Sequence, residues 1–289
     1  MTATLIDGQA IAEKIKAETV AKIKELKTQG VTPKLEVILV GDDKASAMYD
    51  RMKGRAAEKV GMDFALHQLP ATTTEAELIA KIKEIQKAGT TSGLIIQLPL
   101  PEHLYTEKVL NAIDPAIDVD FLTDVNLGRL IMKTNSLIPP TPGAVITILK
   151  ELNVSAAGKN VTIVGMGALV GKPLAVMFIN DGASVTTINS RTKNTKEKCL
   201  AADIIVTGVG KKNLLRGDMI SPGAIVIDTG ISFENGKVYG DVNVAEAKEK
   251  ASFVTPTPGG VGPITVARLL WNTACCAENN LKIKPTQPN

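Results

Sequence analysis

Short apolar segments rich in β-branched residues alternate with longer segments of helical periodicity, and this alternation restricts the fold more than any other feature of the chain. In the first half the strand-like segments are residues 35–41, 64–69 and 92–98, and the helical segments are residues 7–30, 45–61 and 74–89. Strands that are joined through helices pair in parallel, because each connection crosses back over the sheet. The first half is therefore predicted to be a βαβαβ unit with one helix in front.

The second half repeats this alternation after a long interruption. Residues 114–142 hold four prolines and are of mixed polarity, which predicts a long connection and a domain boundary near residue 140. Helices are predicted at residues 143–152 and 172–181, and strands at residues 160–165, 184–189, 203–209 and 223–230. With 289 residues the chain is long enough for two cores. We expect two α/β domains flanking a cleft: residues 1–140, joined by a C-terminal helix at about residues 264–289, and a Rossmann-like parallel-sheet domain at residues 141–263.

The scarcity of metal ligands limits the chemistry that the chain can perform. It has two histidines, His67 and His103, so a three-histidine site is impossible. Its three cysteines exclude a four-cysteine zinc site, and no mixed set has ligand spacing. No metal is therefore expected, and catalysis must use Lys, Tyr, Asp, Gln, the backbone or a bound organic cofactor.

Charge and hydropathy point away from nucleic acids and membranes. The formal net charge of +3 is spread along the chain rather than gathered in a basic patch. The first residues lack the basic and apolar regions of a leader, and no apolar run approaches the length of a membrane span. We expect a cytoplasmic protein with small-molecule partners, in which Cys275 and Cys276 pack on a late helix rather than take part in redox chemistry.

A glycine-rich turn stands between the strand predicted at residues 160–165 and the helix that follows it. It contains Gly165, Gly167 and Gly171, with Met166 and Val170 between them. In such a turn the first glycine permits a sharp bend, the second lets a pyrophosphate approach the backbone, and N–H groups at the helix start bind the anion. We interpret it as a dinucleotide site, and a structural tight turn is the alternative. A Walker-type phosphate loop is excluded, because a proline stands where its hydroxyl residue would be.

The end of the next strand indicates which dinucleotide binds. NAD enzymes usually place an acidic residue there for the ribose hydroxyls. This chain has Ser190, Arg191 and Thr192 instead, and a hydroxyl with a guanidinium suits a 2′-phosphate, so NADP is favoured and NAD stays possible. The alternative is that Arg191 is an ordinary surface side chain. Further candidate cofactor-binding residues at the ends of the following strands are Gly208, Gly230 and Ile231.

Two side chains on the helix predicted at residues 45–61 have a spacing suited to acid–base chemistry. Tyr49 and Lys53 are four residues apart, so they share one face of the helix. A lysine partly withdrawn from water beside a phenol can have its pKa lowered toward neutrality and can then transfer protons. The alternative is a surface lysine on a charged helix.

Other polar residues are expected near the same site. Gln97 ends an apolar strand, which is where open α/β sheets assemble ligand sites, and Leu98 and Pro99 follow it. Asp118 and Asp120 lie in the long connection, next to the expected cleft. Their alternative role is ordinary loop solvation.

The glycine-punctuated loop at residues 255–263 is the last candidate. It contains Pro258, Gly259 and Gly260, and such a loop can wrap closely around a flat ligand. The alternative is a plain turn that starts the last helix, since Pro263 fits the first helical turn.

Together these segments resemble the bifunctional methylenetetrahydrofolate dehydrogenase/methenyltetrahydrofolate cyclohydrolase family over nearly the full length of the chain. The resemblance rests on Tyr49-x-x-x-Lys53, Gln97-Leu-Pro-Leu-Pro101, Asp118-Val-Asp120, Val170-Gly171-x-Pro173, Ser190-Arg191-Thr192 and Pro258-Gly-Gly-Val-Gly-Pro263. It implies oxidation of 5,10-methylenetetrahydrofolate to the 5,10-methenyl form by NAD(P)⁺, followed by hydrolysis to 10-formyltetrahydrofolate. It further implies a homodimer, with the folate in the cleft between the domains.

The same resemblance implies roles for individual residues. Lys53 would be the principal acid–base residue of the hydrolysis, with Tyr49 stacking on the folate and Gln97 hydrogen-bonding to Lys53. Asp120 would bind the pterin. The candidate substrate site is completed by Leu98, Pro99, Pro258, Gly259 and Gly260.

The chain also departs from the family pattern. Met166 and Gly167 stand where the family usually has Arg-Ser, Ile117 replaces a lysine and Phe121 replaces a glycine. The first change removes a phosphate contact and leaves the choice between NADP and NAD open. One alternative function is therefore a protein that is chiefly a cyclohydrolase.

Two further alternatives come from other classes of protein. A non-catalytic dinucleotide-binding module would bind without turnover, but it leaves Tyr49, Lys53, Gln97 and Asp120 unexplained. A shikimate-type dehydrogenase would carry a Lys–Asp pair in its amino-terminal domain and would lack the loop at residues 258–263.

Overall fold

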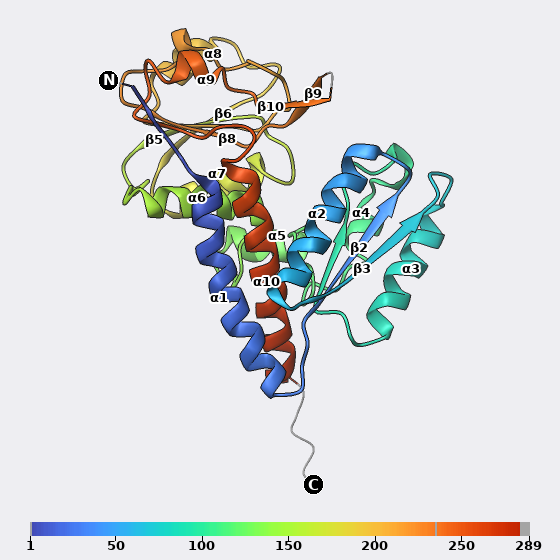
Figure 1. The fold of residues 1–289 in the computed structure, drawn as a ribbon. Coiled ribbons are helices and arrows are strands. Elements are labelled where there is room, and N and C mark those ends of the chain that lie inside the picture. Colours follow the sequence, from blue (N-terminus) through green and yellow to red (C-terminus); the bar gives the residue numbers. More distant parts are fainter. Residues whose placement is uncertain (1, 235, 284–289) are drawn as a thin grey trace. The chain divides into compact units, whose positions relative to one another are not determined.

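The computed structural model describes residues 2–234 and 236–283, and its contacts divide the chain into two compact units (Figure 1). The six-stranded unit holds the chain up to Glu13 and Arg129–Thr265, and the three-stranded unit holds Lys14–Gly128 and the chain from Val266 onward. The predicted division near residue 140, with residues 1–140 kept together, differs from this one. Part of the reason is that β1 (Thr4–Leu5) pairs with β11 (Phe253–Val254), far along the chain.

The six-stranded unit is built on a parallel sheet with the strand order β1-β11-β8-β7-β5-β6. Its longer strands are β5 (Asn160–Val164), β6 (Ser184–Ile188), β7 (Ile204–Thr207) and β8 (Ile225–Asp228). Its helices are α6 (Pro140–Glu151), α7 (Gly171–Asn180), α8 (Thr195–Leu200) and α9 (Val244–Ala247), and the hairpin β9 (Ser232–Glu234) and β10 (Lys237–Tyr239) follows β8.

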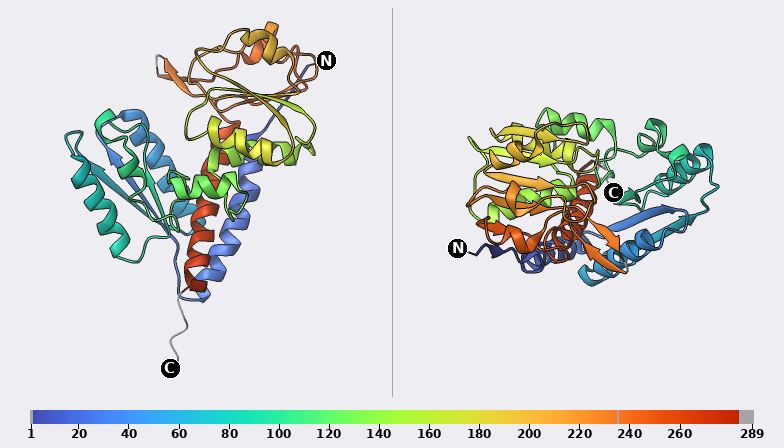
Figure 2. Two further views of the ribbon diagram at one scale, coloured as in Figure 1. Left: turned by 180° about the vertical axis from the view of Figure 1, so that it is seen from behind. Right: turned by 90° about the horizontal axis from the view of Figure 1, so that it is seen from above.

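Both faces of this sheet are covered. Helices α6 and α7 lie on one face and α8 and α9 on the other (Figure 2). The interior includes Val164, Ile205 and Val226 from three neighbouring strands and Cys199 from α8. Such double burial explains why these strands read as continuous apolar runs rather than as alternating patterns. The predicted Rossmann-like parallel-sheet domain is confirmed.

The three-stranded unit has β2 (Lys34–Val40) in the middle, with β3 (Asp63–Leu69) and β4 (Gly93–Ile96) paired in parallel on its two sides. Helices α2 (Lys44–Val60) and α3 (Glu75–Lys87) connect the strands, so the predicted βαβαβ order is confirmed. Helices α1 (Gly8–Thr28) and α10 (Val261–Ile283) begin in the six-stranded unit and end in this one. Within it they are joined by a 3.0 Å ion pair between Lys22 and Glu278.

The long connection predicted over residues 114–142 contains helices that were not predicted there, because α5 (Asp124–Ile131) and the start of α6 lie within it. The hydroxyl of Thr123 accepts the N–H of Asn126 at 3.3 Å and donates to the buried Asp118 at 2.7 Å, which secures the first turn of α5. Three of the four prolines stand at the start of α6, where a missing N–H costs little.

The remaining differences concern element ends and short elements. Helix α10 begins at Val261, ahead of Pro263, and residues 284–289 of the predicted C-terminal helix lie outside the described residues. The short elements α4 (Glu107–Leu110), α8, α9, β1, β9, β10 and β11 were not predicted. Segments of two to six residues are too short to show a periodicity.

Candidate active site

The carboxyl edge of the three-stranded sheet carries the first candidate site. Since β3 and β4 flank β2 on opposite sides, the strand order reverses at β2, and open sheets form ligand sites at such a point. Gln97 follows β4 at this edge, and its backbone N–H donates to the carbonyl of Ile38 on β2 at 2.8 Å. Leu98 and Pro99, which come next, are joined by a cis peptide bond. Helix α2 also leaves β2 at this edge.

Lys53 is buried on α2, and three side chains surround its ammonium group. Nζ donates to Gln97 Oε1 at 2.6 Å and to Asp50 Oδ1 at 3.1 Å, and it lies 4.9 Å from the centre of the Tyr49 ring. The amide of Gln97 is oriented by its own bond to the carbonyl of Leu98 at 2.6 Å, which directs Oε1 to the lysine. Because Lys53 is only 5% exposed, the alternative of a surface lysine is excluded.

Asp50 is a site residue that the sequence analysis missed. Its side chain is fully buried, and Oδ2 has no hydrogen-bond partner among the described residues. Burial raises the pKa of its carboxyl, while the neighbouring Lys53 ammonium opposes that rise. The signal that the sequence offered was the spacing of three residues between Asp50 and Lys53, which places both on one side of a helix.

Tyr49 and Asp120 are partly exposed beside this pair. Burial raises the pKa of Tyr49, with smaller contributions from the carboxylates of Asp120 and Asp50, so the phenol stays neutral. Burial also raises the pKa of Asp120 to about 6, against the opposing effect of Lys53. The structure thus brings Tyr49, Lys53, Gln97 and Asp120 into one neighbourhood.

Asp118 has a structural role instead of an exposed one. It is buried, and its Oδ1 accepts the N–H of Leu122 at 2.9 Å while Oδ2 accepts the N–H of Thr123 at 2.9 Å. The side chain of Asn126 donates to Oδ2 as well, at 3.0 Å. The expectation of a solvated or ligand-facing carboxylate at Asp118 is therefore wrong, because this carboxylate closes the loop that presents Asp120.

Two departures from the family pattern, Ile117 and Phe121, are interior packing changes. Both side chains are buried. Phe121 has φ 60°, the left-handed conformation, which glycine adopts freely and which costs other residues about 1–2 kcal/mol. The backbone beside Asp120 thus keeps a conformation suited to glycine while it carries an aromatic side chain.

In the six-stranded unit, the glycine-rich turn lies at the end of β5, where the strand order also reverses. Gly165 has φ 104°, and a Cβ added to Gly167 would meet no atom within 4 Å. A Cβ added to Gly171 would overlap the carbonyl oxygen of Gly165 and lie 2.8 Å from Met166 Cα. Helix α7 starts without a side-chain cap at Val170. In its first turn the N–H of Lys172 donates to the carbonyl of Gly167 at 3.1 Å and Pro173 has no N–H, so the backbone N–H of Gly171 is the group placed to meet an anion. This arrangement fits a dinucleotide pyrophosphate.

Ser190 and Arg191 are exposed on a turn after β6. Asn189 closes the turn, because its Oδ1 accepts the N–H of Arg191 at 2.9 Å and its own N–H donates to Thr192 Oγ1 at 3.0 Å. The exposed side chains are compatible with both a 2′-phosphate contact and a surface position. Ile231, after β8, is 47% exposed.

Two buried carboxylates, also missed, hold the other candidate cofactor-binding segments. Asp228 at the end of β8 accepts the N–H of Gly230 at 2.9 Å. Asp241 accepts the N–H of Val209, next to Gly208, at 2.6 Å. Burial raises the pKa of Asp228, and its hydrogen bonds oppose that rise. The sequence signal for Asp228 was its position as a polar residue at the end of an apolar strand, which is also how Gln97 was identified.

Pro258, Gly259 and Gly260 belong to the six-stranded unit, and the residues around Lys53 belong to the three-stranded unit. Gly259 is exposed with φ 104°, and the N–H of the buried Gly260 donates to the carbonyl of Pro256 at 2.9 Å. The backbone of this loop thus forms a tight turn that leads into α10. This is the alternative considered above, a plain turn that starts the last helix.

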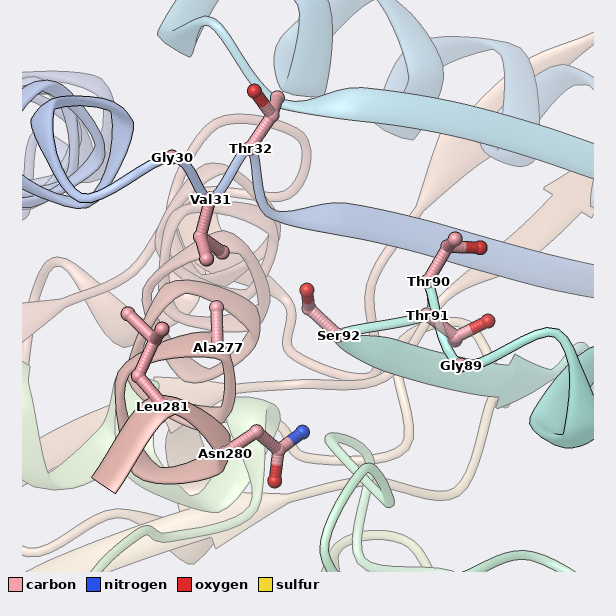
Figure 3. A pocket seen from close by; sticks show the side chains of 10 residues that line it. All are labelled: Gly30, Val31, Thr32, Gly89, Thr90, Thr91, Ser92, Ala277, Asn280 and Leu281. Carbon is pink, nitrogen blue, oxygen red and sulfur yellow. The ribbon is translucent and has the colours of Figure 1, made fainter. Parts of the chain in front are cut away.

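A pocket of about 220 Å³ lies at the amino ends of β2 and β4, on the edge of the sheet opposite Gln97 (Figure 3). It is lined by Gly30, Val31, Thr32, Gly89, Thr90, Thr91, Ser92, Ala277, Asn280 and Leu281. The hydroxyl of Thr91 already donates to Glu36 at 2.8 Å, and that of Ser92 accepts the N–H of Lys34 at 3.2 Å. None of the lining residues has a side chain that titrates near neutral pH, so we assign no acid–base chemistry to this pocket.

The histidines are engaged elsewhere. His67 Nε2 lies 2.6 Å from Glu36 Oε2, and His103 Nε2 lies 3.1 Å from the carbonyl oxygen of Thr73. Within residues 2–234 and 236–283, no three His, Cys, Asp or Glu side chains are grouped so that they could hold a metal ion. None of the helices in the described part of the chain has the length and apolarity needed to span a membrane.

Both units match one known family. Residues 6–120 match the tetrahydrofolate dehydrogenase/cyclohydrolase catalytic domain, and residues 139–281 match the NAD(P)-binding domain of the same family. The chain belongs to the tetrahydrofolate dehydrogenase/cyclohydrolase family. Family membership excludes the shikimate-type alternative, and a shikimate dehydrogenase from Listeria monocytogenes shares only the fold, with a TM-score of 0.52 at 14% identity.

Relatives within this family match end to end. The bifunctional protein FolD of Bacillus subtilis is 44% identical over 97% of this chain and 100% of its own length. The crystal structure of the bifunctional FolD enzyme from Campylobacter jejuni has a TM-score of 0.93 at 40% identity, covering 96% of this chain and 99% of that one. The Trypanosoma brucei FolD enzyme, complexed with NADP cofactor and inhibitor, also has a TM-score of 0.93, at 33% identity, covering 98% and 99%.

Proposed function

We propose that the chain catalyses two successive steps of folate one-carbon chemistry. In the first, 5,10-methylenetetrahydrofolate gives a hydride from its one-carbon bridge to NADP⁺ and becomes the 5,10-methenyltetrahydrofolate cation. In the second, water adds to the bridge carbon, one C–N bond breaks and a proton is released, which gives 10-formyltetrahydrofolate. Membership of the family, with both of its domains represented, supports this proposal.

The observation that carries the hydrolytic step is a buried lysine whose head group is held by an amide oxygen and a carboxylate. An ammonium group has three N–H donors. Two of those on Lys53 are used by Gln97 and Asp50, so one remains for a ligand. Lys53 passes a proton between the attacking water and the folate nitrogen that leaves, so the proton released on one side of the step is returned on the other.

The remaining substrate residues bind and orient the folate. The neutral phenol of Tyr49 stacks on the flat ring system, and Asp120 accepts hydrogen bonds from the pterin. Gln97 holds Lys53 in place and shapes the edge of the site with Leu98 and Pro99. The family resemblance assigns Pro258, Gly259 and Gly260 to the same substrate.

The dinucleotide belongs to the turn at residues 165–171 and to the segments beside it. When bound, NADP⁺ accepts the hydride. The start of α7, which has no side-chain cap and presents the N–H of Gly171, supports pyrophosphate binding, and Ser190 and Arg191 favour a 2′-phosphate. Met166 stands in place of the usual arginine and makes no phosphate contact, so NAD⁺ remains an alternative cofactor. The residues assigned to the cofactor are Gly165, Met166, Gly167, Val170, Gly171, Ser190, Arg191, Thr192, Gly208, Gly230 and Ile231.

Organisation and assembly complete the proposal. We assign the folate site to residues 1–140 with the C-terminal helix, and the dinucleotide site to residues 141–263. The family resemblance supports a homodimer. The three free thiols, Cys199, Cys275 and Cys276, support a reducing, cytoplasmic location. The small net charge of +3, spread along the chain, supports small-molecule rather than nucleic-acid or membrane partners.

The deciding experiment offers 5,10-methylenetetrahydrofolate with NADP⁺ or NAD⁺ and follows methenyl formation, and then its decay, by absorbance. We expect both steps, faster with NADP⁺. Decay of added methenyltetrahydrofolate without any turnover of either dinucleotide would instead identify a protein that is only a cyclohydrolase. Dinucleotide binding without either step would identify a non-catalytic module.

Lys53→Ala tests the role of the lysine. We expect hydrolysis to fall to the uncatalysed rate, while dinucleotide binding persists because the glycine-rich turn is in the other unit. Lys59→Ala, an exposed position on the same helix, is the matched control and should hydrolyse normally. Normal hydrolysis by Lys53→Ala would remove Lys53 from the mechanism.

A further inference from the structure

Asp50 is a buried carboxylate placed one helical turn before the proposed acid–base lysine. Its side chain has no exposed surface, Oδ1 is 3.1 Å from Lys53 Nζ, and Oδ2 has no hydrogen-bond partner in the described part of the chain. A half-satisfied buried ion pair is a poor device for stability, because the cost of dehydrating both charges is only partly returned. The pair is better explained by what it does to the charge of the site.

The charges around Lys53 show which group can balance it. Tyr49 is neutral, since burial raises the pKa of its phenol. Asp120 and Lys53 interact through space, without a hydrogen bond between them among the described residues, and Asp120 is the residue assigned above to the pterin. Asp50 is the carboxylate in hydrogen-bond contact with Nζ. It is also on the same rigid helix, so it accompanies the lysine whatever ligand is bound.

The two folate substrates differ in charge at the reacting carbon. The bridge of 5,10-methylenetetrahydrofolate is neutral, and that of 5,10-methenyltetrahydrofolate carries one positive charge. A bare ammonium beside this carbon would repel the second substrate and not the first. At an effective dielectric constant of about 20, two unit charges about 4 Å apart change an affinity by about three orders of magnitude, and two charges about 12 Å apart still change it by about one.

We propose that Asp50 is the counter-ion of Lys53 that allows the site to accept the cationic folate. It is a positioning residue that acts through the lysine, and this inference rests on the proposed function. With Asp50 ionised, the methenyl cation meets a neutral ion pair. The same neutralisation assists the hydride step, because positive charge develops on the bridge carbon as the hydride leaves.

The test compares the two substrates in Asp50→Asn, which keeps the shape and removes the charge. At neutral pH, we expect the KM for methenyltetrahydrofolate in hydrolysis to rise about tenfold or more, and the KM for methylenetetrahydrofolate to stay within about threefold. The kcat of the hydride step should fall. Glu58→Gln removes a carboxylate from an exposed position of the same helix and should change none of these constants.

The outcomes separate this inference from the proposed function. If the unmodified protein performs neither reaction, the proposed function fails before any variant is made. If it performs both and Asp50→Asn changes the two KM values equally or not at all, Asp50 is not the counter-ion. Asp50→Val removes the same charge without an amide to satisfy, and it repeats the test if Asp50→Asn does not fold. Failure of both variants to fold would assign Asp50 to stability and overturn the proposal.

Discussion

Gly171→Ala should separate the two activities, because Gly171 sits where α7 passes closest to the glycine-rich turn. A methyl group there would overlap the carbonyl oxygen of Gly165 and lie 2.8 Å from Met166 Cα. Ordinary contacts of a Cβ begin at about 3.4 Å, and backbone atoms cannot rotate away as a flexible side chain can. The turn and the start of α7 must therefore move apart by more than 1 Å.

A displacement of this size moves the backbone of the turn, including the N–H of Gly171, that is proposed to bind the pyrophosphate. Misplacing a bound reactant by about 1 Å can lower a rate about 100-fold, which corresponds to about 2.7 kcal/mol. We expect a loss of this size in kcat/KM for the dinucleotide. The overpacking should also lower the free energy of unfolding by about 1–3 kcal/mol. Hydrolysis of added methenyltetrahydrofolate should change less than about threefold, since Lys53 and Gln97 belong to the other unit.

The assay measures both rates and a urea unfolding curve for Gly171→Ala beside a matched control. Gly128→Ala is suitable, because a Cβ at that helical position meets nothing within 4 Å. The control should keep both activities. Unchanged use of the dinucleotide by a folded Gly171→Ala would refute the placement of the pyrophosphate at this turn. Equal loss of both activities would show that the units are not functionally separable.

Three further predictions use the same assays. Gly167→Ala meets no atom within 4 Å and should melt normally, yet it should weaken dinucleotide binding at least about tenfold where a pyrophosphate approaches. The KM for folate should rise as the pH falls below about 6, where Asp120 takes up a proton, and Asp120→Asn should abolish this dependence. Between pH 3.8, the ordinary pKa of an aspartate, and about pH 6, Asp120 is protonated in the folded protein and ionised in the unfolded one. The free energy of unfolding should therefore fall as the pH rises through this window. Asp120→Asn should not show this pH dependence. Phe121→Gly should be less stable than the parent, owing to lost burial, but about 1 kcal/mol more stable than Phe121→Ala in urea, because only glycine relieves the left-handed strain. The reverse order would show that the strain is negligible.

The fold was largely predictable because buried parallel strands and amphipathic helices leave long, regular patterns. The glycine-rich turn was located correctly at the end of β5, because its three glycines lie between a clearly patterned strand and a clearly patterned helix. The helix α5 was missed because its start depends on the buried Asp118 and on Thr123, which interact only after the loop has folded. The prolines beside it suggested a long connection between domains, although most of them begin the next helix.

The site was predictable only in part. Spacing placed Tyr49 and Lys53 on one helical face, but it did not show that a lysine with charged neighbours in sequence would be buried. Lys53 is buried because α2 packs against the sheet, and this packing cannot be predicted from the residues close to Lys53 in sequence. Asp50 and Asp228 were overlooked for a related reason: a carboxylate reads as a surface residue until its buried partners are known. The distinction between Asp118 and Asp120, two residues apart, likewise depends on which one faces inward.

The pairing of β1 with β11 has a consequence for how the protein is made. The six-stranded sheet needs its first strand from the opening residues and that strand's partner from residues near Val254, so its edge cannot close until most of the chain has left the ribosome. The strands β2, β3 and β4, by contrast, are contiguous and can assemble early. Removal of β1 by a short amino-terminal truncation should therefore destabilise the six-stranded unit, most of which lies in the second half of the sequence.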